Sequence, residues 1–414
     1  MKHTLRADTQ NIIDRAIRAV QPDAAVRRAL EGRSFSGRVV LVAAGKAAWQ
    51  MAKAAHETLG ERIDSGVVVT KYGHVLGEIA NFDCYEAGHP VPDENSFRGT
   101  RAALKAVENL TEQDTVLFLL SGGGSALFEE PLIPGEELQD ITAQLLASGA
   151  DIVEMNTIRK RLSAVKGGRF AQRCAPAKVV SVVLSDILGD PLDMIASGPA
   201  CADASTCQQA QEIAKRYNLR LSGQAKALLA EETPKSLDNV ENEITGSVRE
   251  LCAAAADACR ALGYDPTVLT DRLCCEAKEA GSFLGTIARS HGESESSLAF
   301  LAGGETVVHL TGHGKGGRNQ ELALSAAEQI RGLDNVLIFS VGSDGTDGPT
   351  DAAGGMVDGG TAESLEKQGI HIHQVLADND AYHALQKTDG LIITGPTGTN
   401  VNDVAVVLIR GTTR

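Results

Sequence analysis

Short, continuously apolar runs alternate along this chain with longer segments of helical periodicity. The segments RVVLVAAG (38–45) and SGVVVTKYG (65–73) are predominantly apolar. The segment TVLFLLSGGGS (115–125) is an apolar run that ends in glycines, and KVVSVVLSDILGDP (178–191) is an apolar run followed by a loop. Such runs are typical of strands buried on both faces of a mostly parallel sheet. Helix-length amphipathic stretches, such as residues 46–60, separate them. The alternation predicts an α/β protein with a doubly wound, Rossmann-like sheet.

A polar stretch over residues 231–247, EETPKSLDNVENEITGS, interrupts this rhythm, and a second α/β series follows it. Because 414 residues exceed the size of one ordinary core, two domains are expected. We therefore predict an N-terminal domain over residues 1–240 and a smaller C-terminal domain over residues 241–414. The first twenty residues have the pattern of an amphipathic helix and are assigned to the first domain.

Composition narrows the function classes. Apolar residues make up 43% and charged residues 22%, as in soluble globular proteins. A net charge of −15 and only 4% aromatic residues argue against nucleic acid and anionic membranes as partners. The start has no signal-peptide pattern, and the eight cysteines form no C-x-x-C pair. We expect free thiols and a cytoplasmic protein.

Glycine-rich loops follow several predicted strands, where open α/β sheets bind ligands. In AAGKAA (43–48), Lys46 stands at a strand-to-helix turn, although a solvated first-turn lysine is the competing interpretation. A simple tight turn needs one glycine, whereas the loop SGGGS has three that let backbone N–H groups approach a polyphosphate. The predicted nucleotide-binding residues are Ser121, Gly122, Gly123, Gly124 and Ser125.

The segment 155–173 carries six basic residues at partly helical spacing. A solvated helix face is the favoured interpretation of such a run. The KGG within it is unusual for a plain helix, so part of the segment is expected to face the ligand. Asn156 and Lys160 are assigned to substrate or phosphate binding.

Acidic side chains cluster in two further strand-end loops, LSDILGDPLDMIASGP (184–199) and GSDGTDGPTDAAGG (342–355). Carboxylates there can hold Mg²⁺ or accept a hydroxyl proton, while helix caps and Asx turns are the competing roles. We assign Asp186 to catalysis, Glu305, expected to be partly buried, to substrate binding, and the metal to Asp190, Asp344, Asp347 and Asp351.

The loop TGHGKGGRNQE (311–321) supports two interpretations. Gly312, Gly314 and Gly317 fit G-x-G-x-x-G, a weak dinucleotide signal on its own. Lys315 and Arg318 favour phosphoryl transfer, which needs anion cradles, cations and Mg²⁺-binding carboxylates. The second interpretation uses every loop described above, with Lys315 and Gly317 binding phosphate and Arg318 acting with Lys46 in catalysis.

Seven motifs, in order along nearly the whole chain, resemble the class II glycerate 2-kinase family with its C-terminal MOFRL domain. They are AAGKAA, SGGGSALFEEP, MNTIRKRLSAVKGGRFA, LSDILGD, GGETVVHLTGHGKGGRNQE, SVGSDGTDGPTDAAGG and TGPTGTNVNDV. The resemblance implies ATP-dependent phosphorylation of D-glycerate to 2-phosphoglycerate. It also implies a MOFRL-like core at about 297–410, an active site between the two domains, and catalytic roles for Lys46 and Arg318.

Two other functions stay open at this stage. Many family members are labelled hydroxypyruvate reductase, which would make the loop at 311–317 an NAD(P)H site. A non-catalytic regulator that binds a sugar phosphate is a more remote alternative. The partners expected for the kinase are D-glycerate and ATP with Mg²⁺, and a homodimer is one option for the assembly.

Overall fold

A computed structural model describes residues 2–412 of the chain. Contacts divide the protein into two compact units. One is the continuous segment Pro22–Thr245, and the other combines the first 21 residues with the segment that begins at Gly246. Each unit is built on its own six-stranded sheet. Among the described helices, none has the length and apolar character needed to cross a bilayer.

The sheet of the first unit has the strand order β3-β2-β1-β4-β5-β6. The neighbouring pairs from β3 through β5 are all parallel, as the apolar runs predicted. The order reverses between β1 and β4, which is where ligands bind in doubly wound sheets. The strands are β1 (Val39–Ala44), β2 (Ser65–Lys71), β3 (Phe82–Ala87), β4 (Thr115–Leu120), β5 (Lys178–Leu184) and β6 (Val240–Gly246).

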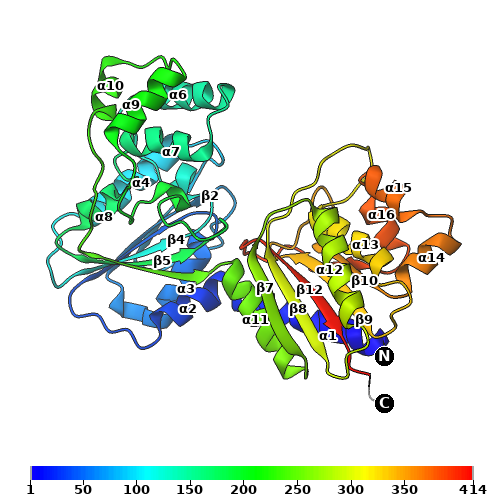
Figure 1. The fold of residues 1–414 in the computed structure, drawn as a ribbon. Helices are drawn as coiled ribbons and strands as arrows, with labels where there is room; N and C mark the ends of the chain where they lie inside the picture. The colour runs from blue at the N-terminus through cyan, green and yellow to red at the C-terminus, as the bar shows by residue number, and fades with distance from the viewer. Residues whose placement is uncertain (1, 413–414) are drawn as a thin grey trace. The chain divides into compact units, whose positions relative to one another are not determined.

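Helices cover both faces of this sheet (Figure 1). On one face α2 (Pro22–Leu30) and α3 (Ala48–Leu59) pack against alternate residues of β1, β4 and β5. On the other face, α4 (Glu94–Ala106) and α8 (Arg169–Cys174) enclose a core that contains three tightly packed phenylalanines. Burial on both faces explains why the strands have no polar alternation.

A further group of helices has a small apolar core of its own. It comprises α6 (Gly135–Ala147), α7 (Ile152–Arg161), α9 (Cys207–Arg216) and α10 (Gly223–Leu229). The short elements η1 (Gly60–Arg62), α5 (Gly124–Leu127) and η2 (Ile195–Ser197) lie in the loops between longer ones.

The second unit has a mixed sheet in the order β11-β10-β9-β12-β8-β7. Only β7 and β8 pair in parallel, and the other four pairs are antiparallel. The second unit is therefore an α/β domain, as predicted, with a sheet whose strand directions the sequence analysis left open. Strands β9 and β12 are buried along their whole length, so their apolar pattern does not reveal strand direction. The strands are β7 (Asp265–Leu273), β8 (Leu298–Gly304), β9 (Val336–Gly342), β10 (Gly354–Asp358), β11 (Leu391–Ile392) and β12 (Asp403–Ile409).

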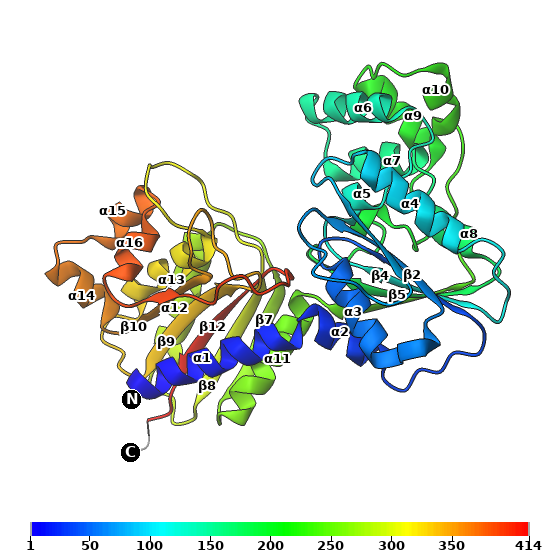
Figure 2. The same cartoon turned by 180° about the vertical axis from the view of Figure 1, so that it is seen from behind.

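Helices also cover both faces of the mixed sheet. One face carries α12 (Ala277–His291), α13 (Arg318–Gln329), α14 (Thr361–Lys367), α15 (Ile372–Ala377) and α16 (Ala381–Gln386). The opposite face carries α11 (Val248–Ala261) and, beside it, α1 (Lys2–Ala19), as Figure 2 shows.

Helix α1 was predicted to belong to the N-terminal domain, but the structure places it in the second unit. Leu5, Ile12 and Ile13 on its inner face are fully buried. The carboxylate of Asp8 accepts hydrogen bonds from Tyr264 and Arg410, each at 2.7 Å. An amphipathic pattern shows that a helix buries one face. It does not show which of two sheets that face packs against, so the domain of α1 could not be read from it.

Candidate active site

The loops after β1 and β4 are tied together where the strand order reverses. The N–H of Lys46 donates to the carbonyl of Gly122 at 2.9 Å, and the N–H of Ala47 donates to the hydroxyl of Ser121 at 3.1 Å. Ser121 is buried, so its hydroxyl, predicted to bind nucleotide, instead fixes the turn that carries Lys46. Lys46 itself is exposed.

The four N–H groups from Gly122 to Ser125 have no acceptor anywhere in the described part of the chain. Gly123 has φ +84°, a left-handed conformation that favours glycine. Successive unpaired N–H groups at such a turn form a concave site for an anion. The loop therefore has the geometry that the sequence predicted for a phosphate cradle.

Side chains from three other strand ends lie against this cradle. A Cβ atom on Gly122 would collide with the carboxylate of Asp186, and one on Gly123 would lie 3.0 Å from the His89 ring and 3.2 Å from Cγ of Lys46. Burial lowers the pKa of His89, and the charges of Lys46, Lys71 and His74 lower it further.

Sequence reasoning placed Asp186 and Lys46 in the site but missed Lys71, His74 and His89. Lys71 ends β2, His74 follows in the next turn, and His89 comes two residues after β3. Their position directly after a strand could have identified these three residues. The segments TKYGH and AGHP, however, lack the glycine cluster that marks the other ligand-binding loops.

Behind the cradle, Ser125, Ser197 and Asn156 form a chain of hydrogen bonds. The hydroxyls of Ser125 and Ser197 lie 3.1 Å apart, and the Ser197 hydroxyl donates to Oδ1 of Asn156 at 3.0 Å. Ala196 and Ser197 have φ of +51° and +61°, a strained conformation for residues with a Cβ. Asn156 was predicted to bind substrate. In the structure its side chain holds Ser197, and Ser197 in turn contacts Ser125 at the end of the Gly122–Ser125 turn.

The basic segment 155–173 is largely buried, so the favoured interpretation of a solvated face was wrong. Arg161 and Lys166 have no exposed side-chain surface, and Lys160 has 3%. Their charges are balanced within the first unit by Asp203, Glu232 and Glu129, which lie elsewhere in the sequence.

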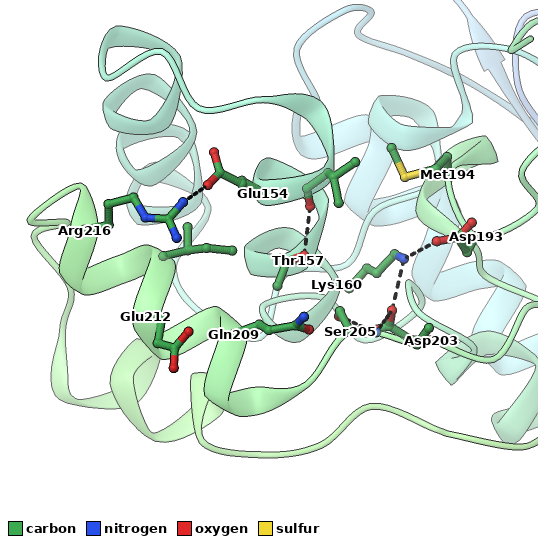
Figure 3. A pocket seen from close by; sticks show the side chains of 13 residues that line it. Glu154, Thr157, Lys160, Asp193, Met194, Asp203, Ser205, Gln209, Glu212 and Arg216 are labelled. Carbon is green, nitrogen blue, oxygen red and sulfur yellow. Dashed lines mark hydrogen bonds and ion pairs between the residues drawn. The ribbon is translucent and has the colours of Figure 1, made fainter.

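Lys160 lines a cavity of about 460 Å³ beside α7 and α9 (Figure 3). Its Nζ lies 3.1 Å from Oδ1 of Asp203 and 3.3 Å from Oδ2 of Asp193. Burial alone would raise the pKa of Asp203, but hydrogen bonds from Thr233 and Ser205 and the charge of Lys160 hold it below its usual value. Lys160 is therefore already paired, which weakens its predicted role in phosphate binding.

In the second unit, Arg318 begins α13 and is held by two carboxylates. Its Nε and Nη2 donate to Asp403 at 2.6 and 3.1 Å, and Nη1 donates to Glu305 at 2.8 Å. Burial would lower the pKa of Arg318, but Asp403 outweighs it and holds that pKa well above its ordinary value. Asp403 opens β12 opposite Gly304 and Gly342, so the antiparallel register brings it beside the strand end that carries Glu305.

Glu305 was expected to be partly buried, yet its side chain is 46% exposed and pairs with Arg318. Asp403 was missed in the sequence, although the motif TGPTGTNVNDV contains it. Its position at the start of a buried strand directly after a glycine-rich loop is the signal that could have identified it.

Asp347 has a structural task that the sequence did not reveal. Its two carboxylate oxygens accept from the N–H groups of Asn319 and Gln320 at 3.1 and 2.9 Å, which caps α13 beside Arg318. Burial raises the pKa of Asp347 to about 6, against the opposing effect of these hydrogen bonds.

The other two acidic residues of that loop also have protein partners. Asp344 accepts from the N–H of Thr346, and Asp351 accepts from the hydroxyl of Tyr382, whose ring lies 4.3 Å below Nζ of Lys315. Among the residues that the structure describes, no group of three or more His, Cys, Asp or Glu side chains is arranged to hold a metal ion.

Residues 311–315 of the glycine-rich loop at 311–317 are clamped by residues 378–380. The N–H groups of residues 311 to 315 all donate to this segment, two of them to Oδ1 of Asn379 at 2.8 and 2.9 Å. A Cβ on Gly312 or Gly314 would collide with Asp378 or Asp380. These two glycines permit the close approach of protein backbone, and their N–H groups are not available to a pyrophosphate.

Comparison with known proteins places this geometry in a family. Residues 8–230 match the family described as Domain of unknown function (DUF4147), and residues 298–403 match the MOFRL family. A D-glycerate 2-kinase from Thermotoga maritima is 54% identical over 404 residues, which cover 96% of this chain and 97% of that protein.

Two further relatives bear on the function. A crystal structure of glycerate kinase from Thermotoga maritima superposes with a TM-score of 0.94 at 52% identity and covers 98% of this chain and 100% of its own. A protein from Agrobacterium vitis named putative hydroxypyruvate reductase is 39% identical, over 97% of this chain and 93% of its own length.

The fold is that of a two-domain α/β protein, with four backbone N–H groups that lack an acceptor among the described residues at the switch point of its parallel sheet. The chain belongs to the glycerate 2-kinase family, with a DUF4147 N-terminal domain and a MOFRL C-terminal domain.

Proposed function

We propose that this chain is a glycerate 2-kinase that transfers the γ-phosphoryl group of ATP to the C2 hydroxyl of D-glycerate. The observation that carries the chemistry is the row of four unpaired N–H groups beside Lys46 at the switch point. The acceptor is inferred from the relative named D-glycerate 2-kinase, at 54% identity over 96% of the chain.

Each group in the proposal has a defined task. The Gly122–Ser125 turn holds phosphate oxygens of ATP through its N–H groups. Lys46 and Arg318 stabilise the charge that spreads over the transferring phosphoryl group and orient the acceptor carboxylate. Asp186, held against the same turn, is the proposed acceptor of the hydroxyl proton.

Magnesium is the expected companion of ATP, and one carboxylate in the loop after β5 is suited to it. Oδ1 of Asp190 is buried and has no hydrogen-bond partner among the described residues. Because Mg²⁺ in kinases takes most of its ligands from phosphates and water, one or two carboxylates suffice. Asp190 would hold the ion, which would neutralise charge on the phosphates. Asp347, whose oxygens cap α13, is the weaker candidate.

The competing activity, reduction of hydroxypyruvate with NAD(P)H, requires a free G-x-G-x-x-G loop that opens a helix directly after a strand. Here β8 ends at Gly304, seven residues before the loop, and the N–H groups of residues 311–315 are bound to residues 378–380. We expect no consumption of NAD(P)H with hydroxypyruvate.

The remaining alternative, a non-catalytic regulator, would bind a phosphosugar without turnover.

Substitution of the two cations tests the proposal. We expect Lys46→Ala and Arg318→Ala each to lower kcat for glycerate-dependent ADP formation by about 10²–10³, because each removes charge stabilisation from the transition state. Arg318→Lys keeps a charge but loses the two-pronged contact with Asp403, and we expect it to rescue little activity. The product is identified as the 2-phosphate by NMR.

Matched controls separate chemistry from folding. Lys53→Ala removes a lysine from α3 that forms only an exposed pair with Glu57, and Arg249→Ala removes an exposed arginine paired with Asp271. Both should keep near-native activity. Near-native turnover in Lys46→Ala, at an unchanged thermal midpoint, would refute the role of Lys46.

A further inference from the structure

Three adjacent strand ends in the first unit carry basic groups. Strands β1, β2 and β3 are neighbours and parallel, so their carboxyl ends lie along one edge of the sheet. Lys46 follows β1, Lys71 ends β2 and His89 follows β3. His74, in the turn after β2, places Nδ1 2.9 Å from the carbonyl of Lys46.

Among the described residues, no ion pair engages the side chains of Lys46, Lys71 or His89, and the carboxylate of Asp186 lies near them against Gly122. Two other acidic neighbours are engaged elsewhere: Glu86 accepts from the N–H of Val75 at 2.9 Å, and Asp93 accepts from the hydroxyl of Tyr72 at 2.7 Å. In a chain with a net charge of −15, two lysines without an ion pair, beside a histidine that can gain a proton, point to an external anion.

We propose that Lys71, His74 and His89, together with Lys46, form a subsite for a small oxyanion beside the Gly122–Ser125 cradle. The anion is either the carboxylate of the acceptor acid or a phosphate group of the nucleotide. This inference deepens the proposed kinase function and rests on it for the identity of the substrates.

The arrangement makes anion binding pH-dependent. In the free protein, burial and the charges of Lys46, Lys71 and His74 lower the pKa of His89, so the ring is mostly neutral near pH 7. A bound oxyanion offsets those charges and favours the imidazolium, so His89 takes up a proton from solvent on binding. By linkage, the affinity for the anion rises as the pH falls from about 8 toward about 6. The acidic group beside the cradle is Asp186, whose carboxylate lies against Gly122, next to the glycine that His89 contacts.

Calorimetry on the full chain measures this linkage directly. D-glycerate and, separately, a non-hydrolysable ATP analogue are titrated in two buffers of different ionisation enthalpy at about pH 7. The ligand that occupies the subsite should bind with proton uptake in the native protein and without it in His89→Gln. Lys71→Met should weaken the same ligand about tenfold, since it removes a charge-assisted contact. Lys226→Met, an exposed lysine of α10, is the matched control and should change nothing.

Each outcome decides the proposal. Loss of proton uptake in His89→Gln with weaker binding in Lys71→Met, for one ligand and not the other, supports the subsite and identifies its anion. Unchanged uptake and affinity in both variants overturn it. Thermal midpoints show whether a variant is folded, and His89→Asn replaces His89→Gln if the longer side chain disturbs Gly123.

Failure of the kinase proposal would look different. If D-glycerate gives no ADP but inorganic phosphate still binds with proton uptake that requires His89, the subsite stands and the assigned reaction falls. If turnover is normal and the affinity and proton uptake of both substrates are unchanged in the Lys71 and His89 variants, the subsite is refuted and the kinase function is retained.

Discussion

Lys166 and Glu129 form an ion pair in the core of the first unit, 2.7 Å apart, with no exposed surface on either side chain. Burial lowers the pKa of Lys166 to about 8, although the charge of Glu129 opposes this. Nζ of Lys166 also donates to the carbonyl of Phe128 at 3.1 Å. Because both charges have been removed from water, the pair adds little net stability, yet neither partner can be lost alone without a large cost.

We predict that Lys166→Met destabilises the first unit by about 3–5 kcal/mol, because it leaves the Glu129 carboxylate buried without a counter-charge. The double variant Lys166→Met with Glu129→Gln should recover a large part of that loss. Urea unfolding of the four members of the cycle measures the coupling. The exposed pair Lys53–Glu57 is the comparison and should couple by less than about 1 kcal/mol. A double variant as unstable as the single one would contradict this account.

The sequence allowed two of the residues in the proposed machinery to be placed by position alone. Lys46 follows an apolar run and a glycine, and Arg318 follows a glycine-rich loop that opens a helix, so both are at sites where anions bind. The burial of Lys160 and Lys166 could not be foreseen. Their partners Asp203 and Glu129 are more than thirty residues away in sequence, and only the fold brings them together.

At the scale of elements, the two glycine-rich loops differ in what their backbones do. The turn Gly122–Ser125 leaves its N–H groups unpaired, whereas residues 311–315 donate all of theirs to residues 378–380. The same composition therefore serves ligand binding in one loop and backbone packing in the other. Periodicity and glycine content cannot separate these cases, because the segment that clamps the second loop lies more than sixty residues further along the chain.

Asn379 is the centre of this clamp, and its replacement tests the clamp's purpose. Oδ1 accepts from Thr311 and Gly312, and Nδ2 donates to the buried Glu321 at 2.8 Å. Its φ is +56°, so glycine can occupy the position without strain. We predict that Asn379→Gly lowers kcat about tenfold or more, because the loop that leads into Arg318 loses two of its five backbone anchors and the contact with Glu321.

Steady-state kinetics and limited proteolysis of residues 311–317 provide the measurement. Asn218→Gly makes the same change at another left-handed asparagine, one that is exposed, and should have no effect on either assay. Native kcat in Asn379→Gly, with equal protection of the loop, would show that the clamp is dispensable.

The fully buried central strands were predicted, because such a strand is a short apolar run wherever it occurs. Strands β3, β6 and β10 were not predicted, since they carry polar residues, and β6 lies within the polar stretch that was interpreted as the domain boundary. The sequence also did not indicate the direction of the strands in the second unit, since β9 and β12 are as fully buried as the parallel strands of the first. Burial depends on the helices that cover a sheet, and both sheets are covered on both faces.

At the scale of the whole molecule, the chain begins in one unit, builds the other, and then returns. Residues 1–21 pack with the segment from Gly246 onward, while Pro22–Thr245 forms a unit of its own. Leu5, Ile12 and Ile13 of α1 each contribute about 1.5–3 kcal/mol when their apolar surface is buried in the second unit. The predicted boundary at residue 240 therefore falls inside β6. The prediction also lacked a boundary between residues 21 and 22, where the first unit begins.

This organisation predicts how two fragments of the chain behave. A fragment of residues 22–246 keeps all of β1–β6 and should unfold in one cooperative thermal transition, because it retains the complete first unit. A fragment of residues 1–240 loses most of β6 and carries α1 without the sheet that covers it. Its buried face, which includes Leu5 and Ile12, would be exposed, so we expect self-association and a lower midpoint. Circular dichroism melts and light scattering compare the two at equal concentration. If residues 1–240 prove monomeric and as stable as residues 22–246, then α1 belongs with the first unit and the division described here is wrong.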